Sequence, residues 1–158
     1  FTIQQYRYGG DIQIEVARID DEAICRDCMI PRFTLQPLAE NAIFHGLEPK
    51  GGFGSVLLEI CLSPGDGDVL VTLTDDGVGM PPEQVAHLLD PPKTQSDAQD
   101  KIRHVGLWNV HRRLQYSFGS RYGLTVESEP GVGTAVTIRL PYRRNEGGGQ
   151  ANAADPTG

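Results

Sequence analysis

The pattern of apolar and polar residues along this chain predicts five strands and three helices. The clearest strand signal is the run VLVTLT at residues 69–74, which is apolar, rich in β-branched residues and of strand length. Strands are expected at residues 11–19, 55–62, 68–75, 122–128 and 133–140, and helices at 34–45, 81–90 and 106–118. We therefore expect an α+β fold, a two-layer α/β sandwich in which helices cover one face of a mixed sheet.

The segment DDGVGM, from Asp75 to Met80, follows the clearest strand. A carboxylate at the tip of a buried strand needs a hydrogen-bond donor, and Gly77 and Gly79 lack the Cβ atoms that would keep a ligand away. The amine of an adenine ring can donate to Asp75, whereas guanine would present a carbonyl oxygen to the carboxylate. The other interpretation is an ordinary tight turn, because Asp-Gly is a common turn signal.

The segment LQPLAENAIFHG predicts a helix with Thr34 as N-cap, Pro37 in the first turn and Gly46 as the stop. Glu40 and Asn41 form a polar pair inside this otherwise apolar helix. The amide oxygen of an asparagine suits a hard cation that also binds phosphate oxygens. The alternative is that Asn41 is a core amide with satisfied hydrogen bonds.

Two later segments could complete a nucleotide site. A helix opening at Gly106 would expose backbone N–H groups, which suit phosphate. The turn GVGT, which ends at Thr134, enters an alternating strand and could close one wall of a pocket. Residues 91–105 are polar and turn-prone, and we interpret them as a lid over the ligand, with an ordinary disordered loop as the alternative.

Composition fits one domain. The chain has 158 residues, is 39% hydrophobic and carries a net charge of −7, which argues against general nucleic-acid binding. No apolar run approaches the roughly 20 residues that cross a bilayer, and no secretory signal is expected at the start. We expect a domain at residues 1–142 and a flexible tail at 143–158. The start at Phe1, within a helix-like or strand-like segment, indicates a fragment of a longer protein.

The cysteines predict no metal site. Cys25 and Cys28 have the spacing of zinc ligands, but no second pair of Cys or His follows at the distance that a zinc finger requires. The third, Cys61, lies in an apolar strand and is expected in the core. An odd number of cysteines does not suit a disulfide framework.

In order and spacing, the four segments resemble the N box, the DxGxG box, the second glycine box and the closing Gly-Thr strand of the Bergerat-type ATP-binding domain of histidine kinases, gyrase and MutL. The chain resembles the LytS/YesM class of sensor histidine kinases in three sequence motifs. These are LQPLAENA followed by HG, then GLxNVxxRL, and YGL before Ser128. The resemblance covers about residues 1–142. Several separated motifs that agree in order are more specific than a single glycine-rich match.

The resemblance implies ATP and Mg²⁺ as cofactors. It makes Asn41 the magnesium ligand, Glu40 the acidic residue that polarises the acceptor imidazole, and Asp75 the residue that binds adenine. The remaining residues implied to bind the nucleotide are His45, Gly77, Gly79, Met80, His104, Gly106, Leu107, Asn109 and Thr134.

Three positions depart from the family pattern. Phe44 stands where a lysine is usual, His104 replaces the first glycine of the Gly-x-Gly-Leu loop, and Asp76 adds a negative charge where asparagine is frequent. His104 could instead donate to a phosphate. These departures leave open a nucleotide-binding module with little phosphotransfer. A gyrase-like or MutL-like ATPase is disfavoured, because Pro37 stands at the position of its water-activating glutamate.

The resemblance also implies partners and a location. The domain would transfer the γ-phosphoryl of ATP to a histidine on its own upstream dimerisation and phosphoacceptor helix, and the phosphoryl would then pass to a response regulator. Neither His45 nor His87 nor His111 lies in the acceptor motif of the family, so the acceptor would precede Phe1. The parent protein would be a homodimeric sensor of the inner membrane, with this domain in the cytoplasm and not inserted in the membrane.

Overall fold

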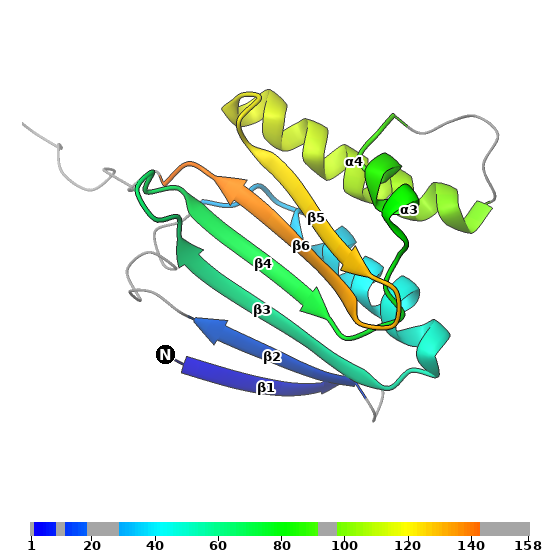
Figure 1. Ribbon diagram of the computed structural model, residues 1–158. Helices are drawn as coiled ribbons and strands as arrows, with labels where there is room; N and C mark the ends of the chain where they lie inside the picture. Colours follow the sequence, from blue (N-terminus) through cyan, green and yellow to red (C-terminus); the bar gives the residue numbers. More distant parts are fainter. Residues whose placement is uncertain (1, 9–11, 19–28, 92–97, 143–158) are drawn as a thin grey trace, which may run out of the picture.

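The computed structural model describes residues 2–8, 12–18, 29–91 and 98–142. Over these residues the chain forms a six-stranded sheet in the order β1-β2-β3-β4-β6-β5 (Figure 1). The strands are β1 (Thr2–Tyr8), β2 (Ile12–Arg18), β3 (Gly54–Leu62), β4 (Val69–Asp75), β5 (Gly123–Glu129) and β6 (Gly133–Leu140).

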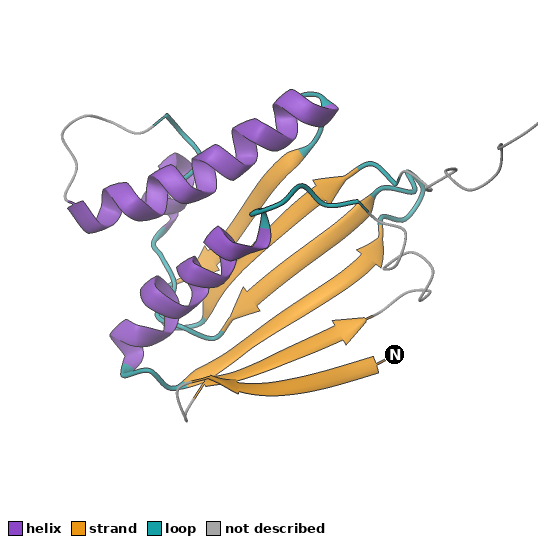
Figure 2. Ribbon diagram, turned by 180° about the vertical axis from the view of Figure 1, so that it is seen from behind, coloured by secondary structure: helices purple, strands orange, loops and turns teal. Residues whose placement is uncertain are grey.

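The sheet is mixed, and its helices lie on one face (Figure 2). β2 and β3 are parallel, whereas the other neighbouring pairs are antiparallel. A parallel pair needs a long crossover, and the crossover from β2 to β3 carries the first of the helical segments that the structure describes. The described helical segments are α2 (Leu35–Glu40), the π-helix η1 (Asn41–Leu47), the 3₁₀ turn η2 (Glu48–Lys50), α3 (Pro82–His87) and α4 (Ala98–Phe118).

The central strand β4 shows how the core forms. Its side chains alternate, and those on the helix side are buried: Val69, Val71, Leu73 and Asp75. The helices contribute fully buried side chains to the same core, among them Leu38, Leu107 and Leu114. The core therefore lies between the helices and one face of the sheet, and the expected two-layer α+β sandwich is confirmed.

The five predicted strands agree with the structure to within one residue at each end. The start of the chain, whose pattern left helix and strand open, forms β1. The helix predicted at 81–90 is shorter, because α3 ends at His87. Cys25, Cys28 and the proposed tail from residue 143 lie outside the described residues.

The predicted start of the last helix is wrong. α4 begins at Ala98, so Gly106 lies well inside the helix and not at its first turn. The reason is local, because residues 98–103 (AQDKIR) are mostly good helix formers and contain neither Gly nor Pro. Residues 98–105 of the expected lid are therefore helical, and residues 92–97 lie outside the described residues.

The helix that carries Asn41 changes type along its length. It is α-helical up to Glu40 and continues as the π-helix η1, in which the backbone N–H of Glu48 donates to the carbonyl of Ile43, five residues earlier. Gly46, expected as the stop, lies inside η1 and is buried, so that expectation is wrong. π-Helical turns are rare and are found frequently at functional sites.

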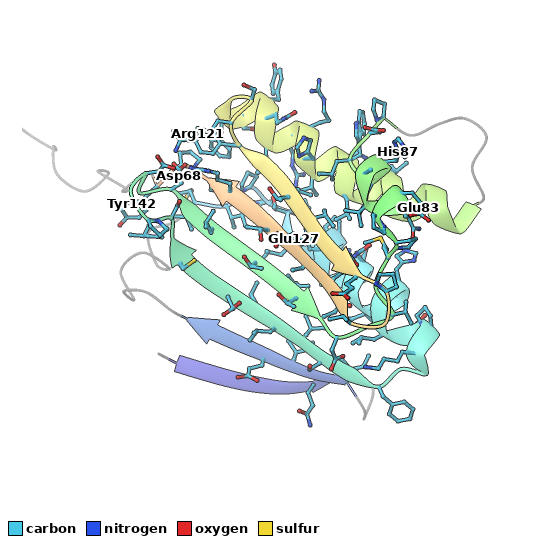
Figure 3. All side chains as sticks on the ribbon, in the orientation of Figure 1. Asp68, Glu83, His87, Arg121, Glu127 and Tyr142 are labelled. Atoms are coloured by element: carbon cyan, nitrogen blue, oxygen red, sulfur yellow. The ribbon has the colours of Figure 1, made fainter. Side chains whose placement is uncertain are left out.

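A charged cluster joins three segments at the start of β4, the end far from Asp75. The carboxylate of Asp68 accepts from Arg121 Nη2 at 2.6 Å and Arg139 Nε at 2.7 Å, and Tyr122 Oη donates to it at 3.2 Å. Figure 3 shows Asp68 and Arg121 together at this end. Burial by itself raises the pKa of Asp68, but the two arginines outweigh it and hold that pKa below its ordinary value.

Candidate functional site

Asp75 ends β4 with its carboxylate on the helix side of the sheet. The alternation of the strand puts it there, and it is 3% exposed. The backbone N–H of Gly77 donates to its Oδ1 at 2.9 Å, which forms the local turn typical of an aspartate followed by glycine. A buried carboxylate is thus present at the predicted position, and the backbone N–H of Gly77 donates a hydrogen bond to it.

Gly46 and Gly77 let η1 approach this carboxylate closely. A Cβ on Gly46 would lie 2.6 Å from Asp75 Oδ1, and a Cβ on Gly77 would lie 2.3 Å from the carbonyl carbon of Gly46. The N–H of Val78 also donates to the carbonyl of Gly46 at 3.0 Å. The structure therefore explains Gly77 by contact with η1, and not by the room for a ligand that the sequence suggested.

Gly79 and Gly133 let the β5–β6 hairpin approach the same loop. Gly79 has a φ of 66°, and a Cβ there would lie 1.9 Å from the carbonyl oxygen of Glu129. A Cβ on Gly133 would lie 2.0 Å from the backbone oxygen of Asp75. The site is thus assembled from three segments that meet backbone to backbone, which larger residues would prevent.

Thr134 lies opposite Asp75 on the neighbouring strand. The two are register partners across β4 and β6, so both face the helices, and Thr134 is 4% exposed. Its hydroxyl lies 2.9 Å from that of Ser128, which also accepts from the N–H of Met80. The Met80 side chain is 1% exposed and belongs to the core. The sequence indicated Met80 and Thr134 but not that Ser128 joins them.

Asn41 and Glu40 point in different directions. Asn41 is 4% exposed and opens η1, whereas Glu40 is exposed and accepts from Gln36 Nε2 at 2.8 Å. Successive side chains on a helix point about 100° apart, which explains the difference. His45 is half-buried, and Phe44, the departure from lysine, is 49% exposed.

α4 brings the second glycine box beside α2. Leu107 is buried in the core, Gly106 is half-buried and Asn109 is exposed. A Cβ on Gly106 would make ordinary contact with Pro37 at 3.6 Å, so packing does not require glycine here. The side chain of His104 lies outside the described part of the structure.

Arg113, which the sequence did not single out for a role, ties α4 to the segment before α2. Its Nη2 donates to Thr34 Oγ1 at 3.1 Å, and that hydroxyl donates to the carbonyl of Pro31 at 2.7 Å. Thr34 occupies the N-cap position of α2, as expected, but its side chain makes no hydrogen bond to that helix.

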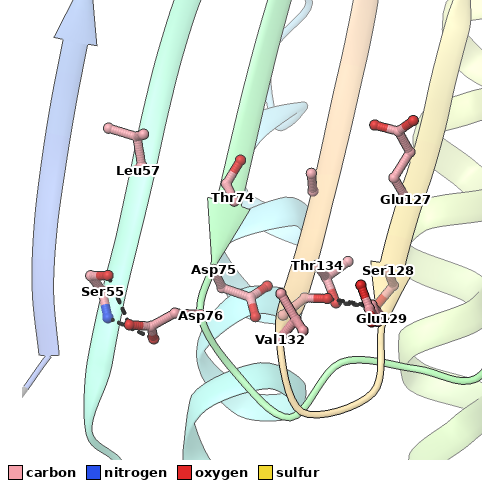
Figure 4. Close-up of a pocket in the computed structure, with 12 residues that line it drawn as sticks. Ser55, Leu57, Thr74, Asp75, Asp76, Glu127, Ser128, Glu129, Val132 and Thr134 are labelled. Atoms are coloured by element: carbon pink, nitrogen blue, oxygen red, sulfur yellow. Dashed lines mark hydrogen bonds between the residues drawn. The ribbon is translucent and has the colours of Figure 1, made fainter.

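The carboxylate of Asp76 has hydrogen-bonding and charged partners that the sequence did not indicate. Its carboxylate accepts from the N–H and the hydroxyl of Ser55, both at 3.0 Å, and Lys50 Nζ lies 3.6 Å away (Figure 4). Burial raises the pKa of Asp76, but the bonds from Ser55 and the charge of Lys50 hold it below its ordinary value. The negative charge that Asp76 adds is therefore paired with a positive charge within the protein.

A hollow of about 510 Å³ opens where β3 and β6 begin and where β4 and β5 end (Figure 4). Leu57, Thr74, Ala135 and Glu127 are register partners in one row across these strands, so they share one face. That row alternates with the row of Asp75, Thr134 and Ser128, and so it faces away from the helices. The floor of the hollow is therefore mostly the uncovered face of the sheet.

No group of three or more His, Cys, Asp or Glu side chains in the described part of the chain is placed to hold a metal ion. None of the helices described is both long enough and apolar enough to cross a membrane.

Residues 29–144 match the family described as histidine kinase-, DNA gyrase B-, and HSP90-like ATPase. The match covers most of the chain, and all four motifs lie within it. The chain belongs to this family. It is an ATP-binding catalytic domain of the kind found in sensor histidine kinases.

Two sensor histidine kinases of known sequence are similar to this chain. Over 142 residues the chain is 37% identical to sensor histidine kinase YesM of Bacillus subtilis, covering 90% of this chain and 22% of that protein. It is 31% identical to sensor histidine kinase YpdA of Escherichia coli, covering 95% of this chain and 24% of that protein. The chain thus spans about a quarter of the length of these relatives.

The chain also matches a solved structure. The blue-light activated histidine kinase of Erythrobacter litoralis EL346 matches 84% of this chain and 36% of its own, with 21% identity and a TM-score of 0.49.

Proposed function

We propose that this domain binds ATP with Mg²⁺ on the helix side of the sheet, and that Asp75 accepts a hydrogen bond from the adenine amine. The buried Asp75 carboxylate is the observation that carries the proposal. A carboxylate that is removed from water is stabilised by hydrogen-bond donors, and a guanine carbonyl at the same place would leave two acceptors facing each other.

Asn41 is the residue we assign to the metal. Magnesium prefers oxygen ligands and keeps several waters, so one amide oxygen together with phosphate oxygens suits it. When bound, the ion would neutralise phosphate charge. The burial of Asn41 at the start of η1, next to the segment that contacts Asp75, supports this assignment.

The phosphates would extend from the base toward α4. Gly106 is the support for this direction, because the described packing gives no steric reason for glycine there. The absence of a side chain at Gly106 leaves the space beside Pro37 open to a ligand. His104, Leu107 and Asn109 complete this side of the proposed site, with Leu107 acting by packing.

The proposed reaction is transfer of the γ-phosphoryl to a histidine on another segment of the parent protein. Such transfer depends on positioning and on charge neutralisation. Glu40 is exposed, so an incoming imidazole could reach its carboxylate, and Gln36 holds that carboxylate in place. The upstream dimerisation helix, a homodimeric membrane sensor with this domain on the cytoplasmic side and a response regulator as the next phosphate acceptor belong to the same proposal.

A nucleotide-binding module with weak transfer is the second candidate. It is favoured by Phe44, which supplies no positive charge and is half exposed at the lysine position. The two candidates agree on ATP binding and differ in the rate of phosphotransfer.

Titration calorimetry of the chain with Mg-ATP and Mg-GTP tests the binding. We expect ATP to bind more tightly, and Asp75→Asn to weaken ATP binding by about 1.5 to 3 kcal/mol, the value of a hydrogen bond to a charged group. Asp76→Asn is the matched control, since Asp76 bonds to Ser55 and Lys50. Equal affinities for the two nucleotides, or equal effects of the two variants, would contradict the proposal.

Radiolabelled ATP tests the transfer. The chain alone should not label itself, whereas the parent protein with its upstream segment should carry an acid-labile phosphoryl group. Acid-stable label on the isolated chain would point to a different class of kinase.

A further inference from the structure

Three polar groups converge on the hydroxyl of Ser128. The N–H of Met80 approaches its oxygen at 2.9 Å, the carbonyl oxygen of Gly133 at 2.8 Å and the hydroxyl of Thr134 at 2.9 Å. Ser128 and Thr134 are register partners, and their contact is drawn in Figure 4. The hydroxyl therefore links the loop after β4 to both residues that open β6.

The numbers of protons and lone pairs on the Ser128 hydroxyl determine the direction of each hydrogen bond. A serine hydroxyl has one proton to donate and two lone pairs that accept. A backbone N–H can only donate, so Met80 donates to Ser128; a carbonyl can only accept, so Ser128 gives its one proton to Gly133. The contact with Thr134 must then be donated by Thr134, and the capacity of Ser128 is filled.

This direction determines what Thr134 offers to a ligand. Its only proton points to Ser128, and in the described structure its hydroxyl has no other hydrogen-bond partner. Toward the space beside Asp75 it therefore presents lone pairs alone. Asp75 and Thr134, register partners on adjacent strands, make a pair of neighbouring acceptors.

We infer that Ser128 is a positioning residue that keeps Thr134 an acceptor, so that the site selects a nucleobase carrying a primary amine. Such an amine has two protons, one for each acceptor or for a water bound to it. A base with a carbonyl at this position meets two acceptors. This inference rests on the proposed placement of the base at Asp75 and Thr134.

The decisive measurement is the affinity for ATP relative to inosine triphosphate, which carries a carbonyl in place of the amine. The native chain should prefer ATP. In Ser128→Ala the hydroxyl of Thr134 loses its acceptor and can turn its proton to the inosine carbonyl. We expect the preference for ATP to fall by about threefold to tenfold, the effect of one neutral hydrogen bond.

A double-mutant cycle separates positioning from a loss of structure. Thr134→Val alone should lower the ATP preference, because it removes one acceptor without changing the size of the side chain. In that background, Ser128→Ala should leave the preference unchanged, since no Thr134 hydroxyl remains to turn. Ser128→Thr retains the hydroxyl and should keep the native preference.

A purely structural role gives a different result. Loss of the Met80 and Gly133 contacts would weaken both nucleotides equally, so an unchanged ratio in Ser128→Ala, or an equal change with and without the Thr134 hydroxyl, overturns the inference. If Ser128→Ala does not fold, the ratios of ATP affinity to inosine triphosphate affinity in Thr134→Val and Ser128→Thr test the inference: an unchanged ratio in Thr134→Val or a lowered ratio in Ser128→Thr overturns it. Binding of ATP that depends on Asp75 would preserve the proposed function in either case, whereas no ATP binding by the native chain would overturn both.

Discussion

The backbone of Gly46 lies against the carboxylate of Asp75 so closely that a single added methyl group would lie 2.6 Å from Oδ1. The contact joins the helix that carries Asn41 to the strand end that carries Asp75. The position of one group therefore depends on the position of the other.

Gly46→Ala should displace Asp75 and weaken ATP binding by at least tenfold. It should also lower the free energy of unfolding by about 1 to 3 kcal/mol, the usual cost of overpacking. Gly106→Ala is the matched control for stability, because its Cβ would only touch Pro37 at 3.6 Å and alanine favours a helix by up to about 1 kcal/mol. Urea unfolding of both variants and calorimetry of Gly46→Ala check this, and similar losses of stability in the two variants would refute it.

Phe44→Lys should tighten ATP binding about threefold and raise phosphotransfer in the parent protein. Phe44 is 49% exposed, so a lysine fits there. Exposure also limits the gain to about 0.2 to 1 kcal/mol through solvent screening. Phe44→Gln supplies length without charge and should give no gain. An effect that survives 1 M salt would rule out the electrostatic explanation.

Asp68→Asn should destabilise the fold without changing nucleotide affinity. The change removes one of the two carboxylates, Asp66 and Asp68, that pair with both Arg121 and Arg139, and we expect a loss of about 1 to 3 kcal/mol in urea unfolding. Because the folded pKa of Asp68 is lowered from 3.8, its contribution is present above pH 3.8 and is lost as the pH falls through the folded pKa. Acid unfolding of Asp68→Asn should lack this component. A change in ATP affinity would contradict the separation of the two ends of β4.

His111→Asn should flatten the pH dependence of stability below about pH 6.5. Burial lowers the pKa of His111, the charge of Arg112 lowers it further, and the N–H of Leu124 donates to Nδ1 at 3.0 Å, which requires an unprotonated nitrogen. The stability from this contact is present above pH 6.5 and is lost as the pH falls through the folded pKa. Asparagine can accept the same bond without titrating. Identical thermal-melting curves against pH for both proteins would refute the role of His111.

Local sequence patterns were sufficient to predict the strands and the position of Asp75 at the end of one of them. The alternation of β4 put this carboxylate on the buried face, and the register with β6 brought Thr134 beside it. Local patterns did not predict the role of Gly46. Its sequence context is that of a helix stop, but the residue contacts Asp75, which lies in a distant segment of the chain. Gly106 was misplaced for a related reason, since the good helix formers before it outweighed the glycine.

The partners of Asp76 and Ser128 left no signal that a single sequence could reveal. Lys50 reaches Asp76 across 26 positions, and Ser128 reaches Met80 across 48. Both contacts depend on how the loops close over the strand ends, and hydroxyl and ammonium groups occur on any surface. The proposed site therefore follows from its motifs, whereas the groups that support it become visible only in three dimensions.

The π-helix η1 makes the spacing of its residues as important as their identity. The hydrogen bonds of η1 span five positions, so each π turn takes in more residues than an α turn. The same residues wound as an α-helix would therefore advance further around the helix axis. A substitution in this segment that favours the α-helix, with the chain length unchanged, would turn Gly46 away from Asp75 even though every residue of the motifs is retained.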